Sequence, residues 1–181
     1  LKYKPISDNF ENKFYLIDSG NDEIYLMTDK GASNYKLIKF IPSTGIFTDL
    51  IPESENVIVK INFVQDKFIM EYLSDGYSKV IVYDKNGLFI NEIAMPSIGS
   101  AIGFSGRKTD KEIFYTFTSF SHPSSIYKYD LVNKTSVLYR KSMFDFKNLD
   151  SSLDESVFKG LIKGYFLSCG YIKSPEKGYA L

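Results

Sequence analysis

Residues 57–94 read VIVKINFVQDKFIMEYLSDGYSKVIVYDKNGLFINEIA, and the architecture of the chain can be inferred from them. Val, Ile, Tyr and Phe are frequent in this stretch, and these residues favour the pleated, half-buried surface of a β-strand. Four runs of strand length can be read in it, at residues 57–64, 67–73, 78–84 and 88–94. Turn-forming residues separate the runs, and the last turn contains Asn86-Gly87, a strong hairpin signal. The stretch therefore predicts one four-stranded antiparallel sheet.

The same pattern occurs before and after this stretch. Strand-like runs precede it at residues 14–18, 23–29, 34–41 and 47–51, and follow it at residues 100–105, 112–118, 125–130 and 136–139. When the third runs of the three sets are aligned, Phe40, Tyr83 and Tyr129 coincide, which gives a repeat of about 43 and then about 46 residues. This repeat has the length of a four-stranded β-propeller blade.

A sheet with two apolar faces cannot bury both of them alone, so neighbouring blades stack face to face around an axis. The predicted fold class is all-β: a partial β-propeller of about three consecutive four-stranded antiparallel blades within residues 1–150. The blades are expected at about residues 10–53, 54–96 and 97–143. A β-sandwich with coincidental spacing also fits short strands at regular intervals. Residues 151–181 form an unassigned tail without clear alternation, which fits the start of another domain, a foreign tail or a disordered end.

Composition and charge exclude several classes of function. The 181 residues are 44% hydrophobic and 24% charged, which is typical of a soluble globular domain. Twenty-two basic residues balance 22 acidic ones, so there is no broad positive field to bind nucleic acid or an anionic membrane. No apolar run approaches the roughly 18 residues that a membrane-spanning helix needs. We therefore expect no nucleic-acid partner and no membrane partner.

The expected location is cytoplasmic. Cys169 is the single cysteine, so the chain has no disulfide framework of the kind that small secreted domains use. Residues 1–10 mix charged residues and a proline with apolar ones, and they lack the apolar run of a signal peptide.

The residues of a serine hydrolase are not predicted here. His122 is the one histidine, and it lies before Pro123 in a serine-rich turn, where an exposed loop residue is a simpler interpretation than a general base. Ser105 lies in Gly103-Phe104-Ser105-Gly106-Arg107, which resembles the first part of a Gly-x-Ser-x-Gly nucleophile elbow. Arg107 stands where the second glycine is required, and we expect a hairpin turn to follow instead of a helix. No catalytic residue is therefore predicted.

Metal and cofactor ligands are not predicted either. One cysteine and one histidine cannot supply a zinc site, and Asp18, Asp22 and Glu23 lack the spacing of a calcium loop. No glycine-rich phosphate loop precedes a helical pattern. The sequence therefore predicts no cofactor, no cofactor-binding residue and no metal-binding residue.

Residues 102–131 are specific enough to indicate a family. They read IGFSGRKTDKEIFYTFTSFSHPSSIYKYDL and closely resemble a propeller segment of prolyl oligopeptidase, a family of serine peptidases. Residues 28–37 and 47–53 are also similar to this family, with Lys36 where arginine is usual and Phe47 in place of tryptophan. The likeness covers about residues 10–158 and fades afterwards.

The resemblance implies that the chain is a partial N-terminal β-propeller domain from a ring of seven blades. In this family the propeller covers the active-site cavity and admits short peptides, which an α/β-hydrolase domain cuts after proline. Residues 159–164 read KGLIKG and depart from the family where its hydrolase domain would begin. Residues 151–181 are therefore interpreted as a crossover remnant and divergent tail, and the catalytic triad is expected outside this chain. The expected partners are the hydrolase domain, the remaining blades of the parent and its short peptide substrates.

Two functions fit these expectations. The first, which the resemblance implies, is that the chain is a fragment of a cytoplasmic prolyl oligopeptidase, a serine-type endopeptidase, in which this part gates substrate access and is not itself catalytic. Alternatively, it is a stand-alone propeller-type protein-interaction module without peptidase activity. The second function requires the ring to be completed, because open blade faces favour association.

Overall fold

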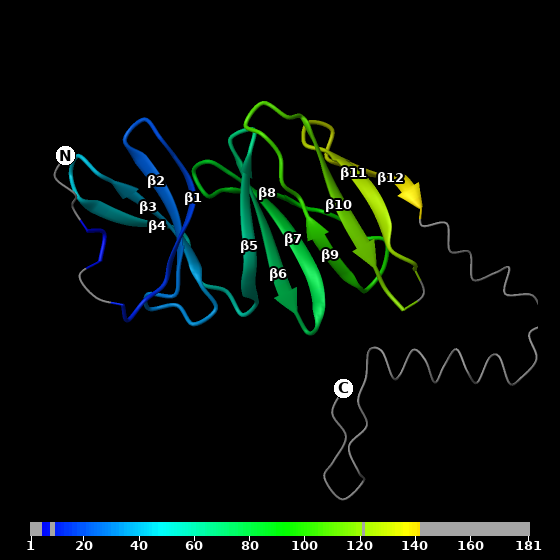
Figure 1. The fold of residues 1–181 in the computed structure, drawn as a ribbon, viewed down its shortest axis with the longest axis horizontal. Helices are drawn as coiled ribbons and strands as arrows, with labels where there is room; N and C mark the ends of the chain where they lie inside the picture. The colour runs from blue at the N-terminus through cyan, green and yellow to red at the C-terminus, as the bar shows by residue number, and fades with distance from the viewer. Residues whose placement is uncertain (1–4, 8–9, 121, 142–181) are drawn as a thin grey trace, which may run out of the picture. The chain divides into compact units, whose positions relative to one another are not determined.

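The computed structural model describes residues 5–7, 10–120 and 122–141. These residues form twelve β-strands in three four-stranded antiparallel sheets, and they contain no helix. Figure 1 shows the sheets following one another in chain order. The described strands belong to one compact unit, residues 1–142, and the predicted tail at residues 151–181 lies outside the described residues.

Each sheet is a meander in which every strand is hydrogen-bonded to its neighbour along the chain. The first sheet consists of β1 (Phe14–Gly20), β2 (Glu23–Thr28), β3 (Lys36–Ile41) and β4 (Ile46–Ile51). The second sheet consists of β5 (Val57–Val64), β6 (Lys67–Ser74), β7 (Tyr77–Asp84) and β8 (Phe89–Glu92). The third sheet consists of β9 (Ser100–Gly103), β10 (Glu112–Thr118), β11 (Ser125–Asp130) and β12 (Thr135–Lys141).

Three of the hairpins close through two residues with positive φ. The pairs are Asn21-Asp22 between β1 and β2, Gln65-Asp66 between β5 and β6, and Asp75-Gly76 between β6 and β7. Two left-handed residues in succession form a type I′ turn, whose twist matches that of the flanking strands. Asn, Asp and Gly accept this conformation most readily, which is why these loops were visible in the sequence.

The hairpin between β7 and β8 is present, and its loop is one residue longer than the predicted turn at residues 85–87. Four residues connect the strands, and Gly87 has a φ of 82°. The Oδ1 atom of Asp84 accepts hydrogen bonds from the backbone N–H groups of Asn86 and Leu88, both at 2.8 Å. The side chain of Asp84 therefore organises this turn.

The strand predicted over residues 100–105 ends earlier, at Gly103. Gly103 has a φ of 124° and Phe104 a φ of 54°, so the chain leaves the sheet at this point. The positive φ of a bulky residue is unfavourable. It is offset here because the Phe104 side chain is fully buried and its ring stacks on Tyr115, with centroids 4.6 Å apart.

Alternation along β6 explains how the second sheet contacts both of its neighbours. Phe68, Met70 and Tyr72 point to one side and join a buried cluster with first-sheet residues such as Tyr25 and Leu37. Residues between them on the strand point to the opposite side, as the pleat requires. A two-faced apolar strand is therefore the central element of the packing.

The opposite side of the second sheet packs on the third. Ile69 and Val82 lie in a second buried cluster with Ile113, Tyr115 and Phe117 of β10. Polar contacts cross the same interface. The backbone N–H of Ser78 donates to the Gly99 carbonyl at 2.9 Å, and the Asn91 side-chain amide donates to the Tyr129 hydroxyl at 2.9 Å.

The sheets therefore stack in chain order, each on the next, which is the arrangement of propeller blades. A β-sandwich would instead pair two sheets into one core, so that alternative is rejected. The predicted fold class, about three consecutive four-stranded antiparallel blades, is confirmed. Among the described residues, no helix with the length and hydrophobicity of a membrane span is found.

Candidate functional site

A depression of about 670 Å³ lies at the third sheet, where β10 begins and β11 ends. The lining residues come from the loop before β10, from β10 itself and from the turn after β11. They are Asp110, Lys111, Glu112, Phe114, Asp130, Val132 and Asn133. We refer to this feature as the β10–β11 depression.

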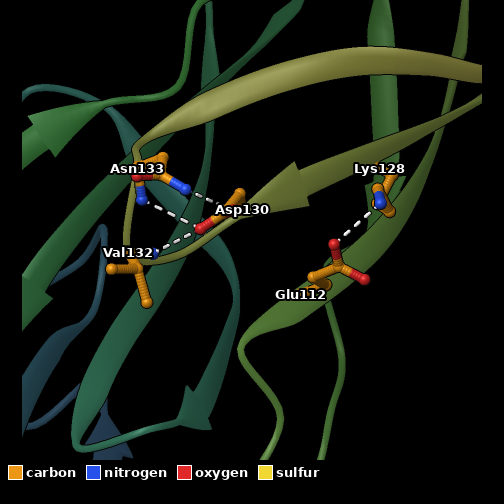
Figure 2. A network of polar contacts seen from close by, with 5 residues as sticks. All are labelled: Glu112, Lys128, Asp130, Val132 and Asn133. Atoms are coloured by element: carbon orange, nitrogen blue, oxygen red, sulfur yellow. Dashed lines mark hydrogen bonds and ion pairs between the residues drawn. The ribbon is translucent and has the colours of Figure 1, made fainter.

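The carboxylate of Asp130 is held by the turn that follows β11. Its Oδ1 accepts hydrogen bonds from the backbone N–H groups of Val132 at 2.8 Å and Asn133 at 2.9 Å. Its Oδ2 accepts a further hydrogen bond from the Asn133 side chain at 2.8 Å, and Figure 2 shows this network. The bonds from Asn133, followed by that from Val132, lower the pKa of Asp130. Asp130 is therefore an ionised turn cap and not a proton donor.

A second of the three carboxylates that line the depression is paired with a cation. Glu112 Oε1 lies 2.7 Å from the Nζ of Lys128, a residue of the neighbouring strand β11 (Figure 2). The hydrogen bond and the charge of Glu112 raise the pKa of Lys128. Because both side chains are in contact with solvent, this pair stabilises the strand pairing only weakly.

The depression carries no arrangement for chemistry on a substrate. Asp130 and Glu112 already have partners, and the pKa of Asp130 is lowered, whereas a general acid requires a raised one. In the part of the chain that the structure describes, no group of three or more His, Cys, Asp or Glu side chains could hold a metal ion. What the depression offers is a polar rim beside an apolar sheet face, which suits packing or recognition.

That apolar face is the side of the third sheet turned away from the second. Ile113 and Tyr115 of β10 are buried toward the second sheet, whereas Phe114 between them points the other way and is 44% exposed. The Phe114 ring meets the ring of Tyr139 edge to face, with centroids 5.0 Å apart. Ile102 of β9 is also exposed. The third sheet thus presents apolar side chains that nothing in the described structure covers.

His122 lies beside two hydroxyl groups in the loop between β10 and β11. Its Nδ1 is 3.3 Å from the Ser119 Oγ and 3.4 Å from the Ser97 Oγ. The backbones of Ser119 and His122 also bond to each other, with the Ser119 N–H donating at 3.0 Å and the His122 N–H at 3.3 Å. His122 is exposed, as expected of a loop residue, and these contacts hold a turn.

Ser105 is exposed in the loop between β9 and β10. The loop leads into strand β10, and the strand-to-helix context of a nucleophile elbow is not found around it. Ser105 lies in the loop before β10 and His122 in the loop after it, so the two residues are at opposite ends of this strand. That no residue of this chain is catalytic remains a prediction.

One unusual carboxyl group, Glu71, was not anticipated from the sequence. Glu71 lies in β6 with 5% of its surface exposed, and burial raises its pKa to about 7. Its Oε1 accepts a hydrogen bond from the Asn62 side chain at 2.9 Å, and Asn62 also donates to the Gly103 carbonyl of the third sheet at 3.2 Å. The signal available in the sequence was a charged residue within an otherwise buried strand. Its contacts place it between two blades and not in a cleft.

Comparison with protein families gives a match over most of the described residues. Residues 2–142 match the model of the prolyl oligopeptidase N-terminal β-propeller domain. The prolyl endopeptidase of Elizabethkingia meningoseptica is 34% identical over 157 residues, which are 85% of this chain and 22% of that protein. The prolyl oligopeptidase ophP of Omphalotus olearius is 31% identical, over 87% of this chain and 22% of that protein.

Solved structures agree with this match. A prolyl endopeptidase from a study of inter-domain dynamics in catalysis and specificity superposes with a TM-score of 0.71 at 25% identity, over 75% of this chain and 20% of that one. Prolyl oligopeptidase B from Galerina marginata also gives a TM-score of 0.71, over 77% of this chain and 20% of that one, and at 20% identity it supports the fold alone. The chain spans about a fifth of the length of the curated relatives that it matches.

Proposed function

The chain belongs to the prolyl oligopeptidase family, as part of its N-terminal β-propeller domain, and from this membership we propose that it gates the active site of a prolyl-specific peptidase. In this proposal the complete enzyme is a cytoplasmic serine-type endopeptidase that cuts short peptides after proline. The present chain contributes blades and no catalytic group. Its partners are the α/β-hydrolase domain, the remaining blades and the peptide that enters between them.

The observation that carries the proposal is the continuous family match over residues 2–142, which spans all three stacked sheets. The chemistry of the chain supports a gating role, because the β10–β11 depression has a polar rim but neither an unpaired acid nor a nucleophile. A gate needs shape and rigidity, which stacked sheets supply.

The open face of the third sheet supports a role inside a larger ring. Phe114, Tyr139 and Ile102 are exposed on the side where another blade would stack. We place the limit of the propeller near residue 150 and interpret residues 151–181 as a crossover remnant and divergent tail. In this view a neighbouring blade covers the exposed aromatic pair.

An exchange of segments tests the proposal. The 157-residue region of the Elizabethkingia endopeptidase that matches this chain is replaced by the corresponding residues of this chain, and cleavage of a fluorogenic proline-containing peptide is measured. We expect the chimera to fold and to cleave after proline. The chain alone is expected to give neither turnover nor labelling by an active-site serine probe.

A Ser105→Ala variant of the chain is the matched control for trace activity. Turnover by the chain that this variant abolishes would contradict the proposal. A folded but inactive chimera, together with a chain that is monomeric and well folded alone, would instead favour the stand-alone interaction module.

A further inference from the structure

One side chain of the third sheet reaches the first sheet. Lys108 lies in the loop between β9 and β10, and its Nζ is 2.7 Å from the Oδ2 of Asp18 in β1. The same Nζ lies 3.5 Å from the carbonyl oxygen of Ser19, which is 89 residues away along the chain. The second sheet packs between these two sheets, so this contact passes over a whole blade.

Between the third and first sheets, the ammonium group of Lys108 lies over an aromatic ring of the second sheet. Its Nζ lies 5.8 Å from the centroid of the Phe63 ring in β5, within the range of a cation–π interaction. Two other rings hold Phe63 in place, because it stacks on Tyr25 of the first sheet at 5.6 Å between centroids and contacts Phe68 of the second at 4.7 Å. The cation therefore touches all three sheets, through its own loop, through Phe63 and through Asp18.

The loop that carries Lys108 is built to hold it there. The backbone N–H of Arg107 donates to the Asp110 carboxylate at 2.8 Å, and the Asp110 N–H donates back to the Arg107 carbonyl at 3.1 Å. Gly106 packs so closely that a Cβ there would lie 3.0 Å from Ile113 and 3.2 Å from Val64 of the second sheet. Because the loop is already ordered against β5, holding Lys108 in place costs only the freedom of its side chain.

The anionic partner is also positioned. The β1–β2 register shifts between Leu16 and Asp18, and such a bulge changes the direction in which the following side chain points. The Asp18 side chain is 19% exposed, against 57% for Lys108. A carboxylate that has lost much of its water gains more from a cation than a fully exposed one does.

This ion pair differs from the others in the part of the chain that the structure describes. Four further ion pairs each join strands of a single sheet: Lys36–Asp49, Lys39–Glu23, Lys79–Glu92 and Lys128–Glu112. Those pairs support strand pairing that backbone hydrogen bonds already fix. The pair of Lys108 with Asp18 instead links sheets that are not neighbours.

We propose that Lys108 is an electrostatic latch that holds the first and third sheets together across the second, at the end where the β1–β2 and β5–β6 hairpins lie. When the latch is closed, the sheets cannot move apart at this end without breaking the ion pair and lifting the cation from Phe63. When it is open, the pairwise apolar packing of the sheets remains there, together with the hydrogen bond from the Asn62 side chain to the Gly103 carbonyl. Salt opens the latch partly, because Lys108 is in contact with solvent.

Amide hydrogen exchange of the full chain, followed by mass spectrometry, tests the latch. Lys108→Met keeps the aliphatic stem and removes the charge, and we expect it to speed exchange by about two- to five-fold, the range that partly exposed ion pairs give. The increase is expected both in the loop at residues 104–111 and in the β1–β2 hairpin of the first sheet. One molar salt is expected to bring the wild-type chain toward the variant.

Lys111→Met is the matched control, because Lys111 is an exposed lysine of the same loop. This substitution should leave amide exchange in the β1–β2 hairpin unchanged. Asp18→Asn should reproduce the effect of Lys108→Met, and the double variant should add little to either one. Should Lys108→Met unfold, Asp18→Asn carries the same test. Faster exchange confined to residues 104–111, or additive effects of the two substitutions, would overturn the latch.

Discussion

Glu71 illustrates how a single residue sets the pH response of a buried strand. Its carboxyl group lies between the second and third sheets and accepts a hydrogen bond from Asn62 at 2.9 Å. Burial raises its pKa to about 7 from an ordinary value of 4.5, while the positive charge of Lys60 and the bond from Asn62 oppose this change. The neutral form is therefore the one that the folded chain accommodates best near pH 6.

We predict that the free energy of unfolding falls as the pH rises from about 5 to 8. Between these values the folded chain retains a proton on Glu71 that the unfolded chain has released. The contribution of Glu71 to the free energy of unfolding is therefore most favourable below pH 4.5, and it is lost as the pH rises past 7. The loss is on the order of 2 kcal/mol. Urea unfolding at pH 5.5 and pH 8 measures it, and Glu71→Gln should remove this part of the pH dependence. An unchanged pH dependence in the variant would show that Glu71 is not the group responsible.

Some positions of single residues could be predicted from the sequence, whereas others could not. The exposed turn position of His122 follows from its neighbours in the chain, and it was predicted. The burial of Glu71 and the ion pair of Lys108 depend on how separate sheets stack, which no local pattern records. Contacts between residues far apart in the chain could therefore not be predicted from the sequence, although each strand could be.

At the scale of elements, strands and turns were predicted well because their signals are local. Alternation and turn-forming residues located all twelve strands, within a few residues at their ends. Deviations occur where a residue other than glycine has a positive φ, as at Tyr35 and Phe104. At such positions tertiary packing overrides the local preference, and the sequence gives no sign of it.

Gly87 and Gly76 form a matched pair that tests the packing of a turn. Both have a positive φ, of 82° and 83°, so alanine is strained equally at either position. A Cβ at Gly87 would collide with the Leu50 carbonyl of the first sheet, whereas at Gly76 it would meet no atom within 4 Å. We predict that Gly87→Ala lowers the free energy of unfolding by about 1–3 kcal/mol more than Gly76→Ala does. Denaturant midpoints of the two variants measure the difference, and equal midpoints would mean that the two sheets are not in contact at this turn.

For the whole molecule, the important feature is the apolar face of the third sheet that no other described residue covers. Phe114 and Tyr139 contact each other there and remain in contact with solvent. Exposed apolar surface of this kind promotes association. The stacking order of the blades followed from the repeat in the sequence, but which side chains remain exposed on the last face did not.

We predict that the chain associates with itself as its concentration rises, and that Phe114→Lys reduces this association. The added charge would have to be buried without a partner if two such faces met. Sedimentation velocity over a range of concentrations measures the effect. Leu88→Lys is the control, because Leu88 is an exposed apolar residue in a turn of the second sheet. If both substitutions acted alike, the third sheet would have no special part in association.

The meander order of the strands has a consequence for how the chain is made. Because each sheet contains only strands that are consecutive in the chain, all hydrogen-bonding partners within the first sheet have been synthesised before β5 emerges from the ribosome. Contacts of short sequence separation form quickly. Blades can therefore form one at a time in chain order, and each completed blade offers an apolar face on which the next one packs. The ion pair of Lys108 with Asp18 can form only after the loop between β9 and β10 has been synthesised, so it follows the first two blades in this order.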